Sequence, residues 1–317
     1  ALDYGVPSFK VFMVYDFGVT DGVFYQVLEK AKEIGAQISV HAENNEMVRY
    51  LTKKFLSEGK TSAWYHYLSR PEFVEAEADK RAIEWAKSLG ASLYIVHLAN
   101  KEGVDAVTKA KDEGYEIYAE TCPHYLTLDE SGYYEEDFRK AAGYICAPPL
   151  RTKADQELLW KGLYNGAIQT VSTDHCSFTL AQKEAGREDF TEIPGGVPGV
   201  ETRGVLMYTF GVAAGKITKE KMAEVLSENP AKLYGAYPRK GAILPGSDAD
   251  IVVYDPDADT TVCAADMISA AEYTPYEGMR TRGSIAQVYL RGKLAVEHGE
   301  VKIGAAGTFI PRTTGTL

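Results

Sequence analysis

Short hydrophobic runs alternate with longer amphipathic stretches through the first part of the chain. The runs are rich in β-branched and aromatic residues, which is typical of strands, and they cover Phe9–Tyr15, Gln37–Ala42, Leu93–Leu98, Glu116–Thr121 and Gln169–Thr173. Helical spacing of apolar residues occurs between them, at Val23–Ile34, Pro71–Leu89 and Val104–Glu113. This alternation predicts parallel βα units whose strands are buried on both faces.

Several predicted strands carry or end in a polar residue that is capable of chemistry. In a βα barrel, the carboxyl ends of the strands and the loops after them form the active site. A doubly wound sheet is typically marked by a Gly-rich phosphate loop, and the chain contains no such motif. The pattern therefore favours a barrel, with candidate residues Lys10 inside the first run, His41 and His97 near the ends of theirs, and Asp174 directly after the last.

The alternation of predicted strands and helices ends at about Lys232. A turn-rich segment at Gly241–Gly246 precedes two short predicted strands, Ala249–Tyr254 and Ala286–Leu290, and Gly292 marks the turn after the second. We therefore expect two units: a barrel domain over residues 1–238, and a small β module with a C-terminal segment over residues 239–317.

Charge and hydropathy exclude some classes of partner. The chain has 317 residues and a formal net charge of −11, without a basic tract, so a nucleic acid or an anionic membrane is not expected as a partner. No apolar run approaches the roughly 18 residues of a membrane span.

The four cysteines (Cys122, Cys146, Cys176 and Cys263) lie far apart and form no Cys-x-x-Cys motif. They are expected to be free thiols in a reducing, cytoplasmic compartment. The chain starts at Ala1 and reaches an apolar run within ten residues. We therefore expect an N-terminal part of the protein to precede this sequence.

His41, His97 and Asp174 leave two interpretations open. A histidine after an apolar strand is often a core residue whose nitrogens are both hydrogen-bonded, and an Asp at a strand end is often a helix N-cap. Alternatively, two imidazoles and a carboxylate at the ends of strands in one sheet suit zinc or a similar divalent metal. In that case Asp174 could also take the proton from an attacking water.

Lys10 lies in the apolar segment Phe9–Phe12, which also leaves two interpretations open. A lysine at an edge extends its ammonium to water. A desolvated lysine has a lowered pKa, becomes a neutral nucleophile and can add carbon dioxide to form a carbamate, which can bridge two metal ions.

The remaining histidines are weaker candidates. His66 is expected in a helix or loop, His124 close to the site, His175 as a residue that orients Asp174, and His298 on the surface of the late β module. Cys176 has no base at a recognisable spacing, so a thiol nucleophile is not expected.

Taken together, the motifs resemble the hydantoinase and dihydropyrimidinase family of the amidohydrolase superfamily, in order and over essentially the whole chain. Ser8–Tyr15 is similar to the strand that carries a carboxylated lysine in that family. The other motifs are His41–Asn44, Tyr94–His97, Glu120–Leu126, Pro148–Arg151, Ser172–Cys176, Ile193–Arg203, Asn229–Lys232, Gly246–Asp250 and Pro275–Met279.

The resemblance implies a TIM-like (β/α)8 barrel with a small β-sandwich module, in which residues 1–238 contain barrel strands 4 to 8 and their helices. It implies two divalent metal ions, zinc above all, bridged by an N6-carboxylysine at Lys10 and a hydroxide. His41 and His97 would bind one metal and Asp174 the other. Asp174 would also serve as base and then as acid, and Tyr15 would hydrogen-bond the developing oxyanion.

The chain departs from the family pattern at three places. The Asp-x-His-x-His motif is absent, and the resemblance implies that this motif and the first three barrel strands precede Ala1. Many hydantoinases have Ser where Ala147 stands and Asn where Gly195 stands. Because the family binds substrate there largely through backbone groups, Ala147 and Gly195 are still expected to contact the substrate.

The resemblance implies a function: opening of a hydantoin or dihydropyrimidine ring to an N-carbamoyl amino acid, by a homotetramer or homodimer. The alternatives are an allantoinase or a dihydroorotase of the same superfamily, and a non-catalytic homologue like the neuronal collapsin-response mediators. The Phe12–Tyr15 and Pro275–Met279 segments favour a hydantoinase, and the presence of all four candidate ligands argues against a non-catalytic protein.

Overall fold

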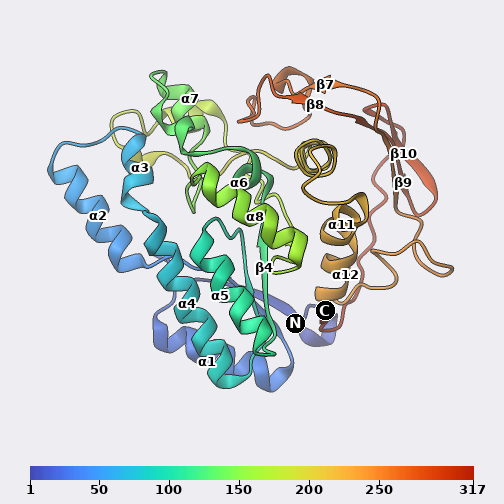
Figure 1. Ribbon diagram of the computed structural model, residues 1–317, viewed down its shortest axis with the longest axis horizontal. Helices are drawn as coiled ribbons and strands as arrows, with labels where there is room; N and C mark the ends of the chain where they lie inside the picture. The colour runs from blue at the N-terminus through green and yellow to red at the C-terminus, as the bar shows by residue number, and fades with distance from the viewer.

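A parallel sheet covered by helices forms the larger part of the molecule (Figure 1). The structure, a computed structural model, describes residues 1–317. The five parallel strands are hydrogen-bonded in the order of the sequence. They confirm the five expected strands with shorter bounds: β1 (Ser8–Phe12), β2 (Gln37–His41), β3 (Leu93–Ile95), β4 (Ile117–Thr121) and β5 (Thr170–Val171).

Helices follow the strands, as βα units require. The three predicted helices are confirmed as α1 (Asp21–Ile34), α4 (Glu72–Leu89) and α5 (Lys101–Asp112). The others in this part are α2 (Asn45–Ser57), α3 (Trp64–Ser69), α6 (Pro123–Thr127), α7 (Phe138–Gly143), α8 (Lys153–Asn165) and α9 (Leu180–Glu184). Further on lie α10 (Arg203–Met207), α11 (Lys219–Ala223) and α12 (Asn229–Leu233), with wider π-type turns at Tyr208–Ala213 and Glu224–Glu228.

Local sequence signals determine where these helices begin and end. At the start of α8, the Thr152 side chain accepts a hydrogen bond from the Asp155 amide, and the Asp155 side chain accepts one from the Thr152 amide. Gly35 and Gly90 end α1 and α4 with φ angles of 67° and 61°, a left-handed conformation that glycine adopts without steric cost.

One continuous apolar cluster joins the sheet to its outer helices. Val40 and Ile95, from neighbouring strands, belong to the same buried cluster as Leu28 of α1 and Val107 of α5. Every residue of β2 is buried, as expected for a strand covered on both faces. This packing holds the carboxyl ends of the strands in fixed positions.

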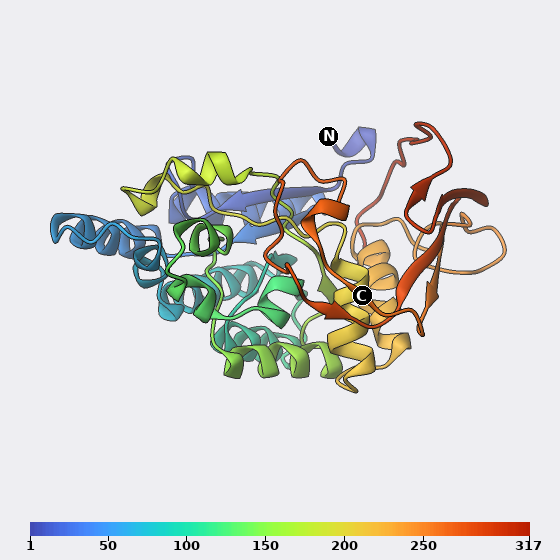
Figure 2. The same ribbon diagram turned by 90° about the horizontal axis from the view of Figure 1, so that it is seen from above.

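The C-terminal part forms a separate antiparallel module. Its main sheet has the order β11-β10-β9-β6 and is made of β6 (Ile251–Asp255), β9 (Ser284–Leu290), β10 (Lys293–Glu297) and β11 (Glu300–Val301). A second ribbon pairs β7 (Thr260–Thr261) with β8 (Arg280–Thr281). Figures 1 and 2 place β9 and β10 beside α11 and α12. The expected β-sandwich thus takes the form of one sheet and a short ribbon, and the boundary at residue 238 stays a prediction within the loop between α12 and β6.

None of the helices combines the length and the apolar character needed to cross a bilayer. All four cysteines are free thiols, with Cys122 and Cys146 buried and the other two half-buried.

Candidate active site

Two histidines meet where neighbouring parallel strands end. His41 is the last residue of β2, and His97 follows β3. Because Val40 pairs with Ile95, the two strands end at the same level. Both side chains are buried, and the centroids of their rings are 4.4 Å apart at an interplanar angle of 73°. The structure therefore brings together two of the candidate residues identified from the sequence.

A buried carboxylate orients His41. The distance from His41 Nε2 to Glu43 Oε2 is 2.7 Å, and Arg70 Nη1 donates to the same oxygen at 2.6 Å. Burial alone would raise the pKa of Glu43, but the Arg70 guanidinium and the His41 contact outweigh it and lower that pKa to about 2. Glu43 is therefore ionised at neutral pH and fixes the His41 ring, as carboxylate partners of metal-binding histidines do.

Sequence reasoning did not single out Glu43 or Arg70 as functional residues. The available signal was a glutamate two residues after a histidine at the end of an apolar strand. Glu43 is fully buried, and a charged side chain in that position requires a partner. Arg70, which supplies it, follows α3 at a distance that no local pattern reveals.

His97 is a neutral imidazole with an unsatisfied nitrogen. Burial lowers its pKa well below the ordinary value, and the charges of His41, Lys10 and His124 act in the same direction. Its Nδ1 atom is buried without a hydrogen-bond partner. The φ angle of His97 is 42°, which is uncommon for a residue with a side chain and is characteristic of functional sites.

Lys10 lies beside this pair but is exposed. Its Nζ atom is 4.9 Å from the centroid of the Phe12 ring, and its charge acts on His97. Within this chain β1 pairs only with β2 and lies at the edge of the parallel sheet, so one side of Lys10 is exposed. Desolvation of this amine stays a prediction.

Asp174 follows β5 and is half-buried, with a φ angle of 42°. Its charge acts on the Tyr15 phenol and on the Cys122 thiol. No group of three or more His, Cys, Asp or Glu side chains in the chain is arranged to hold a metal ion. The neutral imidazole pair, with one buried and unpartnered nitrogen, fits two ligands of a metal centre, and the full set of Lys10, His41, His97 and Asp174 stays a prediction.

Tyr15 lies against the histidine pair. Its ring centroid is 5.4 Å from that of His41, and the Arg70 guanidinium carbon is 5.5 Å from its centre. Burial raises the pKa of the Tyr15 phenol, and the Arg70 charge only partly offsets this. The hydroxyl therefore keeps its proton and can donate a hydrogen bond. Like His97 and Asp174, Tyr15 has a positive φ angle, which is 76°.

Ala147 and Gly195 are adjacent in space. A Cβ atom built on Gly195 would lie 3.9 Å from Ala147 Cβ, and the Gly196 amide donates to the Ile145 carbonyl at 2.9 Å. Nearby, the Cys176 amide donates to the Val197 carbonyl at 3.0 Å, which ties this loop to the segment after Asp174. The two expected substrate contacts are thus adjacent, and the loop after Gly195 is bonded to the segment after Asp174.

The other four histidines lie outside the proposed set of metal ligands. His66 is buried in α3, with Nε2 2.9 Å from the Cys146 carbonyl oxygen. His175 Nδ1 accepts the Gly199 amide at 3.1 Å, so this side chain holds the following loop rather than Asp174, and the expectation that it orients Asp174 is wrong. His124 is buried with both ring nitrogens unpartnered, and His298 is exposed as expected.

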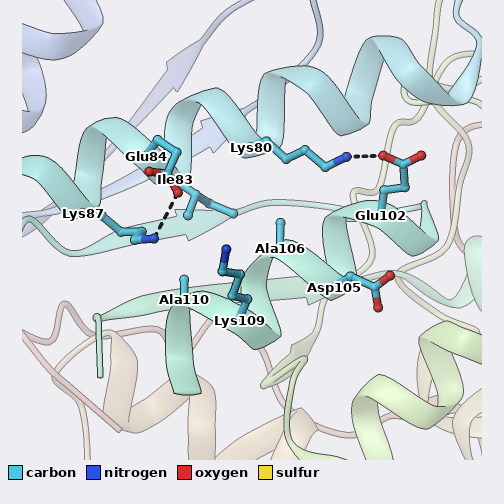
Figure 3. A pocket seen from close by; sticks show the side chains of 9 residues that line it. All are labelled: Lys80, Ile83, Glu84, Lys87, Glu102, Asp105, Ala106, Lys109 and Ala110. Atoms are coloured by element: carbon cyan, nitrogen blue, oxygen red, sulfur yellow. Dashed lines mark hydrogen bonds and ion pairs between the residues drawn. The ribbon is translucent and has the colours of Figure 1, made fainter. Parts of the chain in front are cut away.

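A groove of about 560 Å³ between α4 and α5 is a separate feature (Figure 3). Three lysines and three acidic residues line it, and two ion pairs form among them: Lys87 Nζ is 3.0 Å from Glu84 Oε1, and Lys80 contacts Glu102. A groove with matched charges and no histidine or cysteine offers no catalytic group, so the candidate active site remains at the strand ends.

Known proteins were compared with the chain. A sequence model of the amidohydrolase family matches residues 12–295. The D-hydantoinase of Geobacillus stearothermophilus is 43% identical over 295 residues, which are 92% of this chain and 62% of that enzyme. The chain thus spans less than two thirds of the length of this relative.

Solved structures give the same result. A dihydropyrimidinase from Brevibacillus agri superposes with a TM-score of 0.92 at 41% identity, covering 94% of this chain and 65% of that one. A D-hydantoinase (dihydropyrimidinase) from a Thermus species superposes with a TM-score of 0.95 at 42% identity, covering 98% and 68%. The amidohydrolase family is metal-dependent. With its parallel sheet, its histidine pair and these matches, the chain belongs to the amidohydrolase family, within the group of hydantoinases and dihydropyrimidinases.

Proposed function

We propose that the whole protein is a metal-dependent hydrolase that opens a hydantoin or dihydropyrimidine ring to an N-carbamoyl amino acid. One observation carries the proposal. Two buried imidazoles lie 4.4 Å apart at adjacent strand ends, one oriented by Glu43 and the other with an unpartnered nitrogen. Orphaned buried nitrogens are rare in native proteins, and binding of a metal ion would supply the missing partner of the His97 nitrogen.

The proposed metal ligands are His41 and His97 for one ion and Asp174 for the other, with Lys10 as a carbamate between them. A bound divalent metal, zinc in the first instance, supplies a nucleophilic water at neutral pH and polarises the ring carbonyl.

The chain's own residues would then handle protons and position the ring. Asp174 accepts the proton of the attacking water and returns it to the leaving ring nitrogen. The Tyr15 hydroxyl, which keeps its proton, donates a hydrogen bond to the oxygen on which negative charge develops. Backbone groups at Ala147 and Gly195 hold the ring beside Asp174.

Metal removal tests this function. The whole protein should open hydantoin or dihydrouracil, and dialysis against a chelator should reduce the rate roughly tenfold or more, because the nucleophile and the polarising charge are both lost. Zinc should restore the rate. Full activity of the metal-free protein would contradict the proposal, and a preference for allantoin or dihydroorotate would replace hydantoinase activity with one of those reactions.

Metal content tests the ligand assignment separately. The substitution His97→Asn should lower the amount of metal bound per chain, measured by atomic emission after gel filtration. His298→Asn is a matched control, because His298 also has a positive φ, 46° against 42°, but is exposed on the surface. Asparagine tolerates this backbone conformation, so neither change strains the chain. Equal metal content in the two variants would remove His97 from the site.

The resemblance also supports a homotetramer or homodimer that acts in the cytoplasm. Light scattering of the whole protein measures its oligomeric state.

A further inference from the structure

A fully buried lysine, Lys183, has no role in the chemistry proposed above. It lies in the short helix α9 and its side chain is not exposed at all. It takes part in none of the salt bridges of the chain. A buried ammonium without a carboxylate partner is costly, so its contacts need an explanation.

Two backbone carbonyls are the partners of Lys183. Nζ donates to the Ile145 carbonyl oxygen at 3.0 Å and to the Pro194 carbonyl oxygen at 2.8 Å. These carbonyls belong to two segments far apart in sequence. Each is followed closely by a proposed substrate contact: Ala147 comes two residues after Ile145, and Gly195 directly follows Pro194.

Further contacts show how tightly the two segments are built around this ammonium. The Ile145 carbonyl also accepts the Gly196 amide at 2.9 Å, and His66 Nε2 lies 2.9 Å from the Cys146 carbonyl oxygen. A Cβ atom on Gly186, just after α9, would lie 2.2 Å from Ile193 Cγ1, so the turn after the helix packs directly on the second segment.

We propose that Lys183 is a positioning residue for ring recognition: its ammonium ties the Ile145 carbonyl to the Pro194 carbonyl and sets the spacing of the backbone at Ala147 and Gly195. This inference rests on the proposed function and deepens it. Burial lowers the pKa of Lys183 to about 8, while the Cys146 and Cys176 thiols oppose this effect. The amine nevertheless donates hydrogen bonds in either protonation state.

The substitution Lys183→Met tests the role, because methionine fills the same space without a donor. Loss of both hydrogen bonds should release the two segments. KM for hydantoin or dihydrouracil should rise about tenfold while kcat stays within about threefold, since ring binding and not proton transfer is affected. Lys161→Met is the matched control, because Lys161 is exposed and has no side-chain partner. A KM unchanged from that of the control would overturn the proposal.

Hydrogen exchange supplies a readout that does not depend on activity. Amides of residues 145–147, of Ile193 and of residues 195–197 should exchange faster in Lys183→Met than in the unsubstituted protein, with Gly196 as the most direct reporter because its amide bonds to the Ile145 carbonyl. Equal exchange at both segments would overturn the positioning role. If the unsubstituted protein opens no cyclic amide, the proposed function fails, while faster exchange in the variant still supports the role of Lys183.

If Lys183→Met does not fold, Lys183→Gln takes its place. The glutamine amide keeps a donor on a side chain one bond shorter, so it can reach only one of the two carbonyls. The same rise in KM and faster exchange at one of the two segments support the proposal, and unchanged values for both contradict it.

Discussion

Replacing Asp174 by asparagine should lower kcat for ring opening by roughly 10²- to 10⁴-fold, because an amide cannot accept the proton of the attacking water. Asparagine has the same shape as aspartate and tolerates the φ angle of 42° at this position, so the backbone should remain in place. Steady-state kinetics of the whole protein between about pH 5 and pH 9 measure the effect.

Asp259→Asn is the control for this experiment. Asp259 is exposed in the C-terminal module and its side chain has no hydrogen bond or salt bridge, so its loss should leave kcat unchanged. Metal content has to be measured in both variants, because Asp174 is also a proposed ligand. A variant that keeps its metal and loses kcat supports the role of base, whereas full kcat in Asp174→Asn contradicts it.

Parallel topology explains why part of this site could be predicted. Strand and helix alternate clearly in the sequence, and parallel strands place their carboxyl ends at one edge. His41 and His97, at the ends of β2 and β3, were therefore expected to meet, and their rings are 4.4 Å apart. The adjacency of Ala147 and Gly195 was expected only from the resemblance, since the two lie in separate loops.

Other features depend on contacts that no local pattern encodes. The environment of Lys10 depends on which strands pair with β1, and its apolar neighbours in sequence do not specify that. Arg70, the partner of Glu43, lies 27 residues away from it in sequence. The two carbonyl partners of Lys183 lie 38 and 11 residues away from it. Buried polar partners of this kind follow from tertiary packing, which sequence periodicity does not specify.

The substitution Arg70→Met should destabilise the protein by roughly 3–5 kcal/mol, because it leaves the fully buried Glu43 carboxylate without its strongest partner. Arg70 Nη1 is 2.6 Å from Glu43 Oε2, and its carbonyl oxygen accepts a hydrogen bond from Arg151 Nη1 at 2.7 Å. The backbone carbonyl contact survives the substitution, so the loss reports on the ion pair. Urea denaturation of the metal-free protein measures the change in the free energy of unfolding.

Arg49→Met is the matched control, because the pair Arg49–Asp16 is exposed, with side-chain exposures of 55% and 100%. Such pairs contribute about 0–1 kcal/mol.

The pH dependence of the stability difference adds a second criterion. Since the pKa of Glu43 is lowered from 4.5 to about 2, the ion pair contributes stability above the unfolded-state pKa and loses it as the pH falls through about 2. The difference in unfolding free energy between the unsubstituted protein and Arg70→Met should therefore be smaller at low pH than at neutral pH. A difference that is equally large at low pH, or no larger than that of Arg49→Met at neutral pH, would show that Arg70 does not hold Glu43, and through it His41, in place.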